Sequence, residues 1–119
     1  MGNTTFWGEL KARTDALGVT NLLIMVDDAG LLGDASEAAR NQAVEAHLRW
    51  AEAAALLGCH SIRVNAFGSG SRDALRGALV DGLGNLTEKA AALGVGVEVA
   101  VALRPLRPVG VVAVVVLDR

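Results

Sequence analysis

One pattern recurs three times along the chain: a helical segment ends at a Leu-Gly pair, and a short apolar run follows. The pairs are Leu17-Gly18, Leu57-Gly58 and Leu93-Gly94, so the glycines are 40 and 36 residues apart. Glycine just past a helix readily adopts the left-handed conformation and so ends the helix. The apolar runs that follow predict strands over 21–26, 61–66 and 95–103.

Helical spacing of apolar residues predicts a helix before each of these glycines. In the first helix, over about 5–17, Phe6, Leu10 and Leu17 share one stripe. The second begins with a D-x-x-E sequence, in which Asp34 can cap the free N–H groups and Glu37 can reach back to it. The third, from about 73 to 93, contains three glycines, each costing about 1 kcal/mol relative to alanine: Gly77, Gly82 and Gly84.

The predicted order is therefore three helices that alternate with three strands, followed by a tail. Such alternation implies an α/β fold whose parallel strands are joined by right-handed crossovers. A unit of 36–40 residues fits one βα unit of a barrel or of a doubly wound sheet. Periodicity alone does not separate these two architectures.

Composition narrows the class of protein. The chain has 119 residues, enough for one domain, and at 52% apolar it can bury a largely aliphatic core. A net charge of −2 gives no basic face for nucleic acid. Its single cysteine, Cys59, excludes a disulfide framework and a multi-cysteine zinc site. No secretory signal starts the chain, and the longest apolar run, 109–117, is too short to span a membrane, so a cytoplasmic protein is expected.

Polar residues follow or occupy the predicted strands where α/β proteins place their sites, at the carboxyl ends. Asp27 and Asp28 end the first strand and could bind a metal or a sugar hydroxyl, or simply form a turn. Ser61, Arg63 and Asn65 alternate with apolar residues and share one face of the second strand. That face belongs either to a polar barrel interior or to an edge strand with one wet face.

The loop 67–73 could hold a small anion on the N–H groups at the start of the third helix. It lacks the Walker lysine, and Asp73 stands where a dinucleotide fingerprint needs glycine, so a plain loop is the alternative. His47, His60 and Cys59 have no partners at ligand spacing and are interpreted as structural.

Residues 17–27, 43–66 and 78–95 together resemble sugar phosphate isomerases and epimerases of the xylose isomerase-like TIM-barrel group. The most specific phrase is G-C-H-S-I-R-V-N-A at 58–66. The resemblance covers about 6–95 and implies a fragment of a TIM (β/α)8 barrel, roughly from the third strand to the start of the fifth.

The resemblance also implies metal-assisted proton transfer on a ketose or aldose. Members of the family bind a divalent metal, often Mn²⁺ or Mg²⁺, through two Glu, an Asp and a His at the barrel mouth. Ala100 stands where the first ligating Glu is expected, and Glu98 is a weak candidate beside it. We therefore expect that this chain alone does not complete the metal site.

Asp27, Asp28, Arg63 and Asn65 match strand-end positions of the family and are expected to line a sugar pocket. The expected partners are a small sugar and further copies of the chain, and neither nucleic acid nor a membrane. The alternative function is a non-catalytic α/β domain that binds a small anion at 68–73 or acts in assembly.

The resemblance stops where valines accumulate. Ten of the fifteen valines lie in 95–119, so we divide the chain into partial barrel units over 1–94 and a Val-rich strand with a divergent tail over 95–119. One hypothesis is a frameshift or a truncated gene in GC-rich DNA, which translation of the other frames would test. The alternative is a genuine strand, a turn at Pro105 and Pro108, and a last strand.

Overall fold

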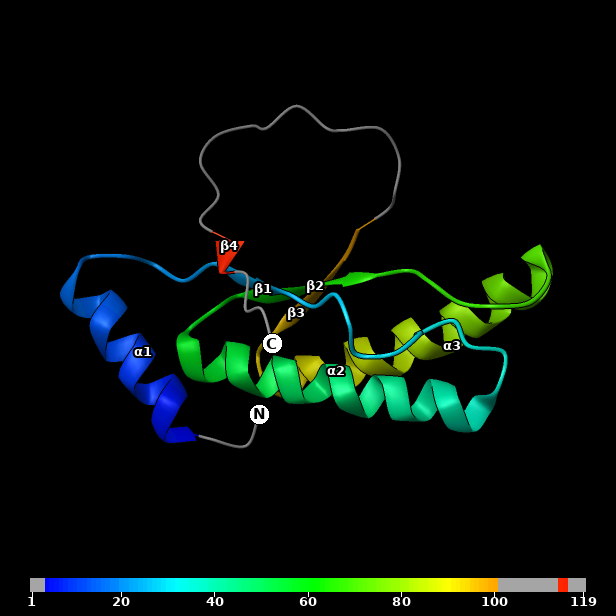
Figure 1. Ribbon diagram of the computed structural model, residues 1–119, viewed down its shortest axis with the longest axis horizontal. Coiled ribbons are helices and arrows are strands. Elements are labelled where there is room, and N and C mark those ends of the chain that lie inside the picture. Colours follow the sequence, from blue (N-terminus) through cyan, green and yellow to red (C-terminus); the bar gives the residue numbers. More distant parts are fainter. Residues whose placement is uncertain (1–3, 101–113, 116–119) are drawn as a thin grey trace, which may run out of the picture.

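The fold was obtained as a computed structural model, which describes residues 4–100 and 114–115 (Figure 1). Helices and strands alternate, as the hydrophobic pattern predicts. The predicted turn at Pro105 and Pro108 lies outside the described residues, and both the division after residue 94 and the frameshift stay predictions. In chain order the elements are α1 (Thr4–Ala16), β1 (Leu23–Met25), α2 (Glu37–Leu57), β2 (Ser61–Asn65), α3 (Arg72–Ala91), β3 (Gly96–Ala100) and β4 (Val114–Val115).

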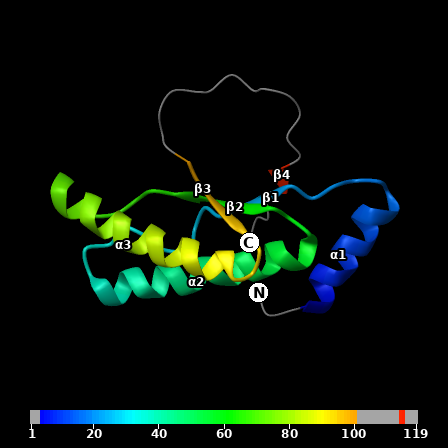
Figure 2. The ribbon, with the colours of Figure 1, turned by 180° about the vertical axis from the view of Figure 1, so that it is seen from behind.

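The strands form one sheet in the order β3-β2-β1-β4, and every neighbouring pair is parallel. Strands β1, β2 and β3 are therefore adjacent in space in the order in which they occur in the chain. Figures 1 and 2 show α2 and α3 on the same side of the sheet. A doubly wound sheet carries helices on both faces. The one-sided arrangement described here is the one that βα units adopt in a barrel.

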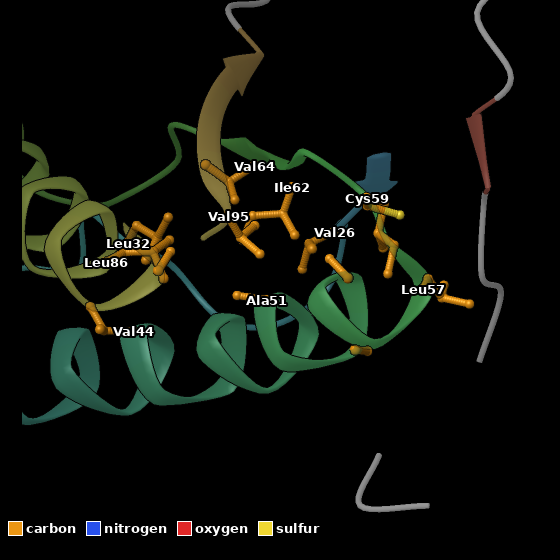
Figure 3. Close-up of a cluster of buried hydrophobic side chains, with 14 of the residues drawn as sticks. Val26, Leu32, Val44, Ala51, Leu57, Cys59, Ile62, Val64, Leu86 and Val95 are labelled. Atoms are coloured by element: carbon orange, nitrogen blue, oxygen red, sulfur yellow. The ribbon is translucent and has the colours of Figure 1, made fainter. Parts of the chain in front are cut away.

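The hydrophobic core lies between the sheet and the two helices that cover it (Figure 3). Alternate strand residues point toward the helices, and Ile24, Ile62 and Val64 are fully buried there. Apart from Trp7 and Cys59, all members of the core cluster are aliphatic, in agreement with the composition. The opposite face of the sheet is thus left for the polar residues of the same strands.

Gly58 directly follows α2 as predicted, whereas α1 and α3 end slightly earlier than predicted, at Ala16 and Ala91, two and three residues before Gly18 and Gly94. Gly18, Gly58 and Gly94 have φ angles of +71°, +79° and +74°, in the left-handed region that favours glycine. The predicted start of the second helix is wrong by two residues. Ser36, not Asp34, is the N-cap: its side chain accepts the N–H of Ala39. Asp34 accepts the N–H of Ser36 at 2.8 Å instead, and so shapes the turn before the helix.

Of the predicted stripe of α1, only Leu10 packs against the core, where it is partly buried. Phe6 is 48% exposed and Leu17 is 79% exposed, whereas Trp7 is buried. The indole of Trp7 meets Trp50 of α2 edge to face, with ring centroids 6.1 Å apart. Trp offers more apolar area than the residues of the predicted stripe, so its contact with α2 sets the rotation of the helix.

The glycines of α3 differ in what surrounds them. No atom lies within 4 Å of the position that a Cβ would take at Gly77 or Gly84. At Gly82 a Cβ would overlap the carbonyl oxygen of Leu32, in the loop between β1 and α2. Gly82 therefore allows this loop to lie directly on the helix. The sequence shows only that glycine weakens a helix and does not reveal this role in packing.

Candidate functional site

A row of polar and half-buried side chains crosses the face of the sheet that points away from α2 and α3. Arg63 of β2 is in register with Met25 of β1 on one side and with Glu98 of β3 on the other. Residues in register on parallel strands share a face, so the three side chains lie on the same side of the sheet. This is the face that lines the interior of a closed barrel.

The carboxyl end of this row brings two predicted site residues together. The Nδ2 of Asn65, at the end of β2, lies 3.4 Å from the Oδ1 of Asp27, just beyond the end of β1. Asn65 is half-buried, and Asp27 and Asp28 are exposed to solvent. Because β2 is flanked by β1 and β3, the alternative interpretation of its polar face as that of an edge strand is wrong.

Arg63 and Glu98 are neighbours without being an ion pair. Within residues 4–100 no salt bridge or hydrogen bond links the Arg63 guanidinium to another side chain. Arg63 is half-buried and Glu98 is exposed. The guanidinium is always charged and is partly desolvated here. Its five N–H groups can donate hydrogen bonds to the oxygens of a ligand or to an anionic group.

Two loops meet above the strand ends through a backbone bridge between Gly33 and Gly68. The N–H of Gly33 donates to the carbonyl of Phe67 at 2.9 Å, and the N–H of Ser69 donates to the carbonyl of Gly33 at 3.3 Å. A Cβ at Gly68 would overlap the Gly33 carbonyl, so only glycine allows this approach. The bridge fixes the two loops relative to each other, six residues beyond Asp27 and three residues beyond Asn65 in the chain.

In the loop 67–73, one backbone donor is already in use, whereas two serine hydroxyls act as acceptors and keep their O–H groups. The hydroxyl of Ser69 accepts the N–H of Ala35, and the hydroxyl of Ser71 caps α3 by accepting the N–H of Ala74. The N–H of Ser69 is used by Gly33. The loop 67–73 therefore offers an anion fewer donors than its sequence suggests.

The described residues do not fit the metal that the family resemblance implies. Among them, no three His, Cys, Asp or Glu side chains lie close enough together to hold an ion. Glu98, the weak candidate, lies on β3 across from Arg63, whereas Asp27 follows β1 at the far side of β2.

The residues interpreted as structural lie away from this edge. His47 is buried in α2, where its Nδ1 is 2.7 Å from the carbonyl of Ala43, and desolvation lowers its pKa although that hydrogen bond opposes the shift. Burial raises the pKa of the Cys59 thiol. His60 lies at the amino end of β2, with its Nδ1 2.7 Å from the hydroxyl of Ser61.

The solved structures that are similar to this chain include two that can be compared in detail. The chain matches 3-keto-D-glucoside 4-epimerase YcjR from E. coli, in its apo form, with a TM-score of 0.69 and 25% identity, over 81% of this chain and 41% of that one. It matches protein SMc04130 from Sinorhizobium meliloti 1021 with a TM-score of 0.63 and 25% identity, over 78% of this chain and 34% of that one. The chain thus spans well under half the length of either protein.

The matches to solved structures agree with a parallel sheet that carries α2 and α3 on one side. The fold is that of a TIM-barrel segment. No family description and no curated protein matches the chain. None of the helices in the described part of the chain combines the length and apolarity needed to cross a membrane.

The sequence gives Phe67 no role of its own. Phe67, which the sequence places in the loop 67–73, lies two residues beyond Asn65, and its side chain is 54% exposed. The signal that could have found it is its spacing, two residues beyond Asn65, which continues the alternation of the strand.

Proposed function

We propose that this barrel segment contributes part of a carbohydrate-binding site of the isomerase and epimerase type. The observation that carries the proposal is the meeting of Asp27 and Asn65 at the carboxyl edge of a sheet that is similar to that of a keto-glucoside epimerase. Binding sites of barrel proteins lie at this edge because the βα loops converge there.

The chemistry of the pair suits a sugar. The Asp27 carboxylate accepts hydrogen bonds, and the Asn65 amide both donates and accepts, so together they can bind two neighbouring hydroxyl groups in a defined orientation. Their mutual distance of 3.4 Å is long for a hydrogen bond, which leaves both groups available to a ligand. Arg63, deeper on the same face, can donate to a carbonyl oxygen of the sugar.

Metal-assisted proton transfer, which the resemblance implies, needs ligands that the described residues do not supply together. The role proposed for this chain is therefore to bind and orient the sugar. We expect it to bind sugar without turnover, with or without Mn²⁺.

The test is a titration of the 119-residue chain, followed by NMR. The ligands are a methyl keto-glucoside and the corresponding methyl glucoside, which has a hydroxyl group in place of the keto group. Asn65→Ala should weaken binding about tenfold, the factor expected for about 1.4 kcal/mol. Asn85→Ala is the matched control, since the Nδ2 of Asn85 lies 3.4 Å from the Oδ1 of Asp81 on α3, far along the chain from the site. Equal affinity in both variants, or no sugar binding by the wild type, would overturn the proposal.

A further inference from the structure

Phe67 stands apart from the other aromatic residues of the chain. Phe6, Trp7 and Trp50 contact one another edge to face where α1 meets α2. The Phe67 ring has no such ring contact among the described residues, and it is 54% exposed. A single exposed phenyl group is ordinary on a protein surface, so exposure alone does not indicate a function. A function for Phe67 has to be inferred from its position in the fold.

The backbone shows which way the Phe67 side chain is directed. The carbonyl of Arg63 accepts from Val26 after β1, and the carbonyl of Phe67 accepts from Gly33 in the loop that follows β1. Residues 63 and 67 thus both turn their carbonyls toward the β1 side, as residues an even number apart do in extended chain. The alternation of β2 therefore continues as far as residue 67.

The next residue supports the same assignment from the other face. A Cβ on Gly68 would meet the Cδ1 of Leu75, on α3, so position 68 faces the helix layer. Neighbouring residues of an extended chain point to opposite faces, so Phe67 points away from α3. Arg63, Asn65 and Phe67 consequently share the face that carries the candidate sugar site.

From this placement we propose that Phe67 is an aromatic platform on which the apolar face of a pyranose ring packs while Asp27 and Asn65 bind its hydroxyls. The inference rests on the proposed function and deepens it, because it adds a contact with the sugar ring to the hydrogen bonds with its hydroxyls, and a glucose-configured pyranoside is the ligand that tests it. In such a sugar all ring hydroxyls are equatorial, and each face of the ring presents axial C–H groups to an aromatic surface.

The site has the physical features that such binding requires. Small-ligand sites combine aromatic surface with a few fixed polar groups. The Gly33–Gly68 bridge holds the backbone on both sides of the Phe67 carbonyl, so little backbone freedom remains to be lost when a ring packs on the phenyl group. An already exposed phenyl gains apolar contact without having to leave a core.

The experiment is saturation-transfer NMR on the full chain with methyl β-D-glucopyranoside, with irradiation of the aromatic protons. We expect the axial protons of one ring face, either H1, H3 and H5 or H2 and H4, to receive more saturation than those of the other face. The chain has only two phenylalanines, so a Phe67→Leu variant assigns the responding ring.

Affinities of variants supply the second measurement. Phe67→Ala should weaken binding about tenfold and Phe67→Leu at least about threefold, the range that aromatic contacts of roughly 0.5–1.5 kcal/mol produce. Phe6→Ala is the matched control: Phe6 is similarly exposed, at 48%, but lies on α1. The hydrogen bond made by the Phe67 carbonyl persists in each Phe67 variant, and unchanged circular dichroism will confirm that the fold is intact.

The outcomes separate this inference from the proposed function. Loss of affinity in Phe67→Ala but not in Phe6→Ala, together with face-selective saturation, supports the platform. Binding that depends on Asn65 and is unchanged in both phenylalanine variants overturns the platform and leaves the proposed function standing. If the wild type does not bind the glucoside, the platform is overturned, and if it does not bind the keto-glucoside either, the proposed function is wrong as well.

Discussion

The three glycines of α3 provide a sharp test of how the β1–α2 loop packs. Gly77→Ala and Gly84→Ala place a methyl group in open space, so each should gain the full helical advantage of alanine, about 1 kcal/mol. Gly82→Ala gains the same amount, but its methyl group would overlap the carbonyl oxygen of Leu32. It would also lie 3.0 Å from the Leu32 carbonyl carbon and 3.3 Å from the Cγ of Arg40.

The cost at Gly82 follows from which atoms are contacted. Leu32 is fully buried, and the overlapping atom belongs to its backbone, so the loop cannot turn a flexible side-chain end away. Overpacking typically costs about 1–3 kcal/mol, and a backbone clash belongs at the upper end of that range. Subtracting the helical gain of about 1 kcal/mol from a cost of about 3 leaves a net loss of about 2 kcal/mol for Gly82→Ala.

Urea unfolding followed by far-ultraviolet circular dichroism measures these differences. We expect the midpoint to rise in Gly84→Ala and to fall in Gly82→Ala, with free energies of unfolding that differ by about 3 kcal/mol. An equal rise in both variants would refute the reasoning, because it would mean that the loop carrying Leu32 does not lie on α3. Gly77→Ala is the internal replicate and should behave like Gly84→Ala.

Two further predictions concern charged groups. Arg40 is largely buried and joins Asp81 at 2.7 Å and the Asp34 carbonyl at 2.9 Å, so Asp81→Ala should cost about 1 kcal/mol in urea unfolding. Glu52→Ala, which breaks an exposed pair, should cost less than about 0.5 kcal/mol, and equal losses would contradict the argument. Because burial lowers the pKa of His47, the unfolded chain binds the proton first as pH falls below the ordinary 6.5, so stability should be constant above that pH and decrease below it. His47→Gln should flatten this decrease below pH 6.5, and an unchanged pH profile would show that another group is responsible.

Local physics explains which elements could be predicted from the sequence. A left-handed glycine stop depends on one residue, so the ends of α2 and of its neighbours could be placed from Gly18, Gly58 and Gly94. The strand-end position of Asp27 and Asn65 follows from the same alternation of helices and strands. Their proximity needs only that β1 and β2 be parallel neighbours, which the order of elements already implies.

The features that the sequence did not predict depend on contacts between segments that are far apart in the chain. The rotation of α1 is set by Trp7 against Trp50, residues that no helical periodicity connects. The value of Gly82 comes from a loop fifty residues earlier in the chain. A barrel and a doubly wound sheet share one period and differ in strand order and in the faces that the helices cover, which depend on contacts between units, so the sequence could not separate them.

The position of β4 has a consequence for the order in which the molecule folds. Pairing β1 with β2 joins residues 38 positions apart, and pairing β2 with β3 joins residues 35 apart, whereas β4 meets β1 across 91. Closing the longer loop costs about 0.8 kcal/mol more in chain entropy. Strand β4 has only two residues whose pairing with β1 can offset this cost. We therefore expect the βα units to assemble first by neighbour-to-neighbour pairing, and β4 to join last and leave first, with its amides exchanging with solvent faster than those of β2.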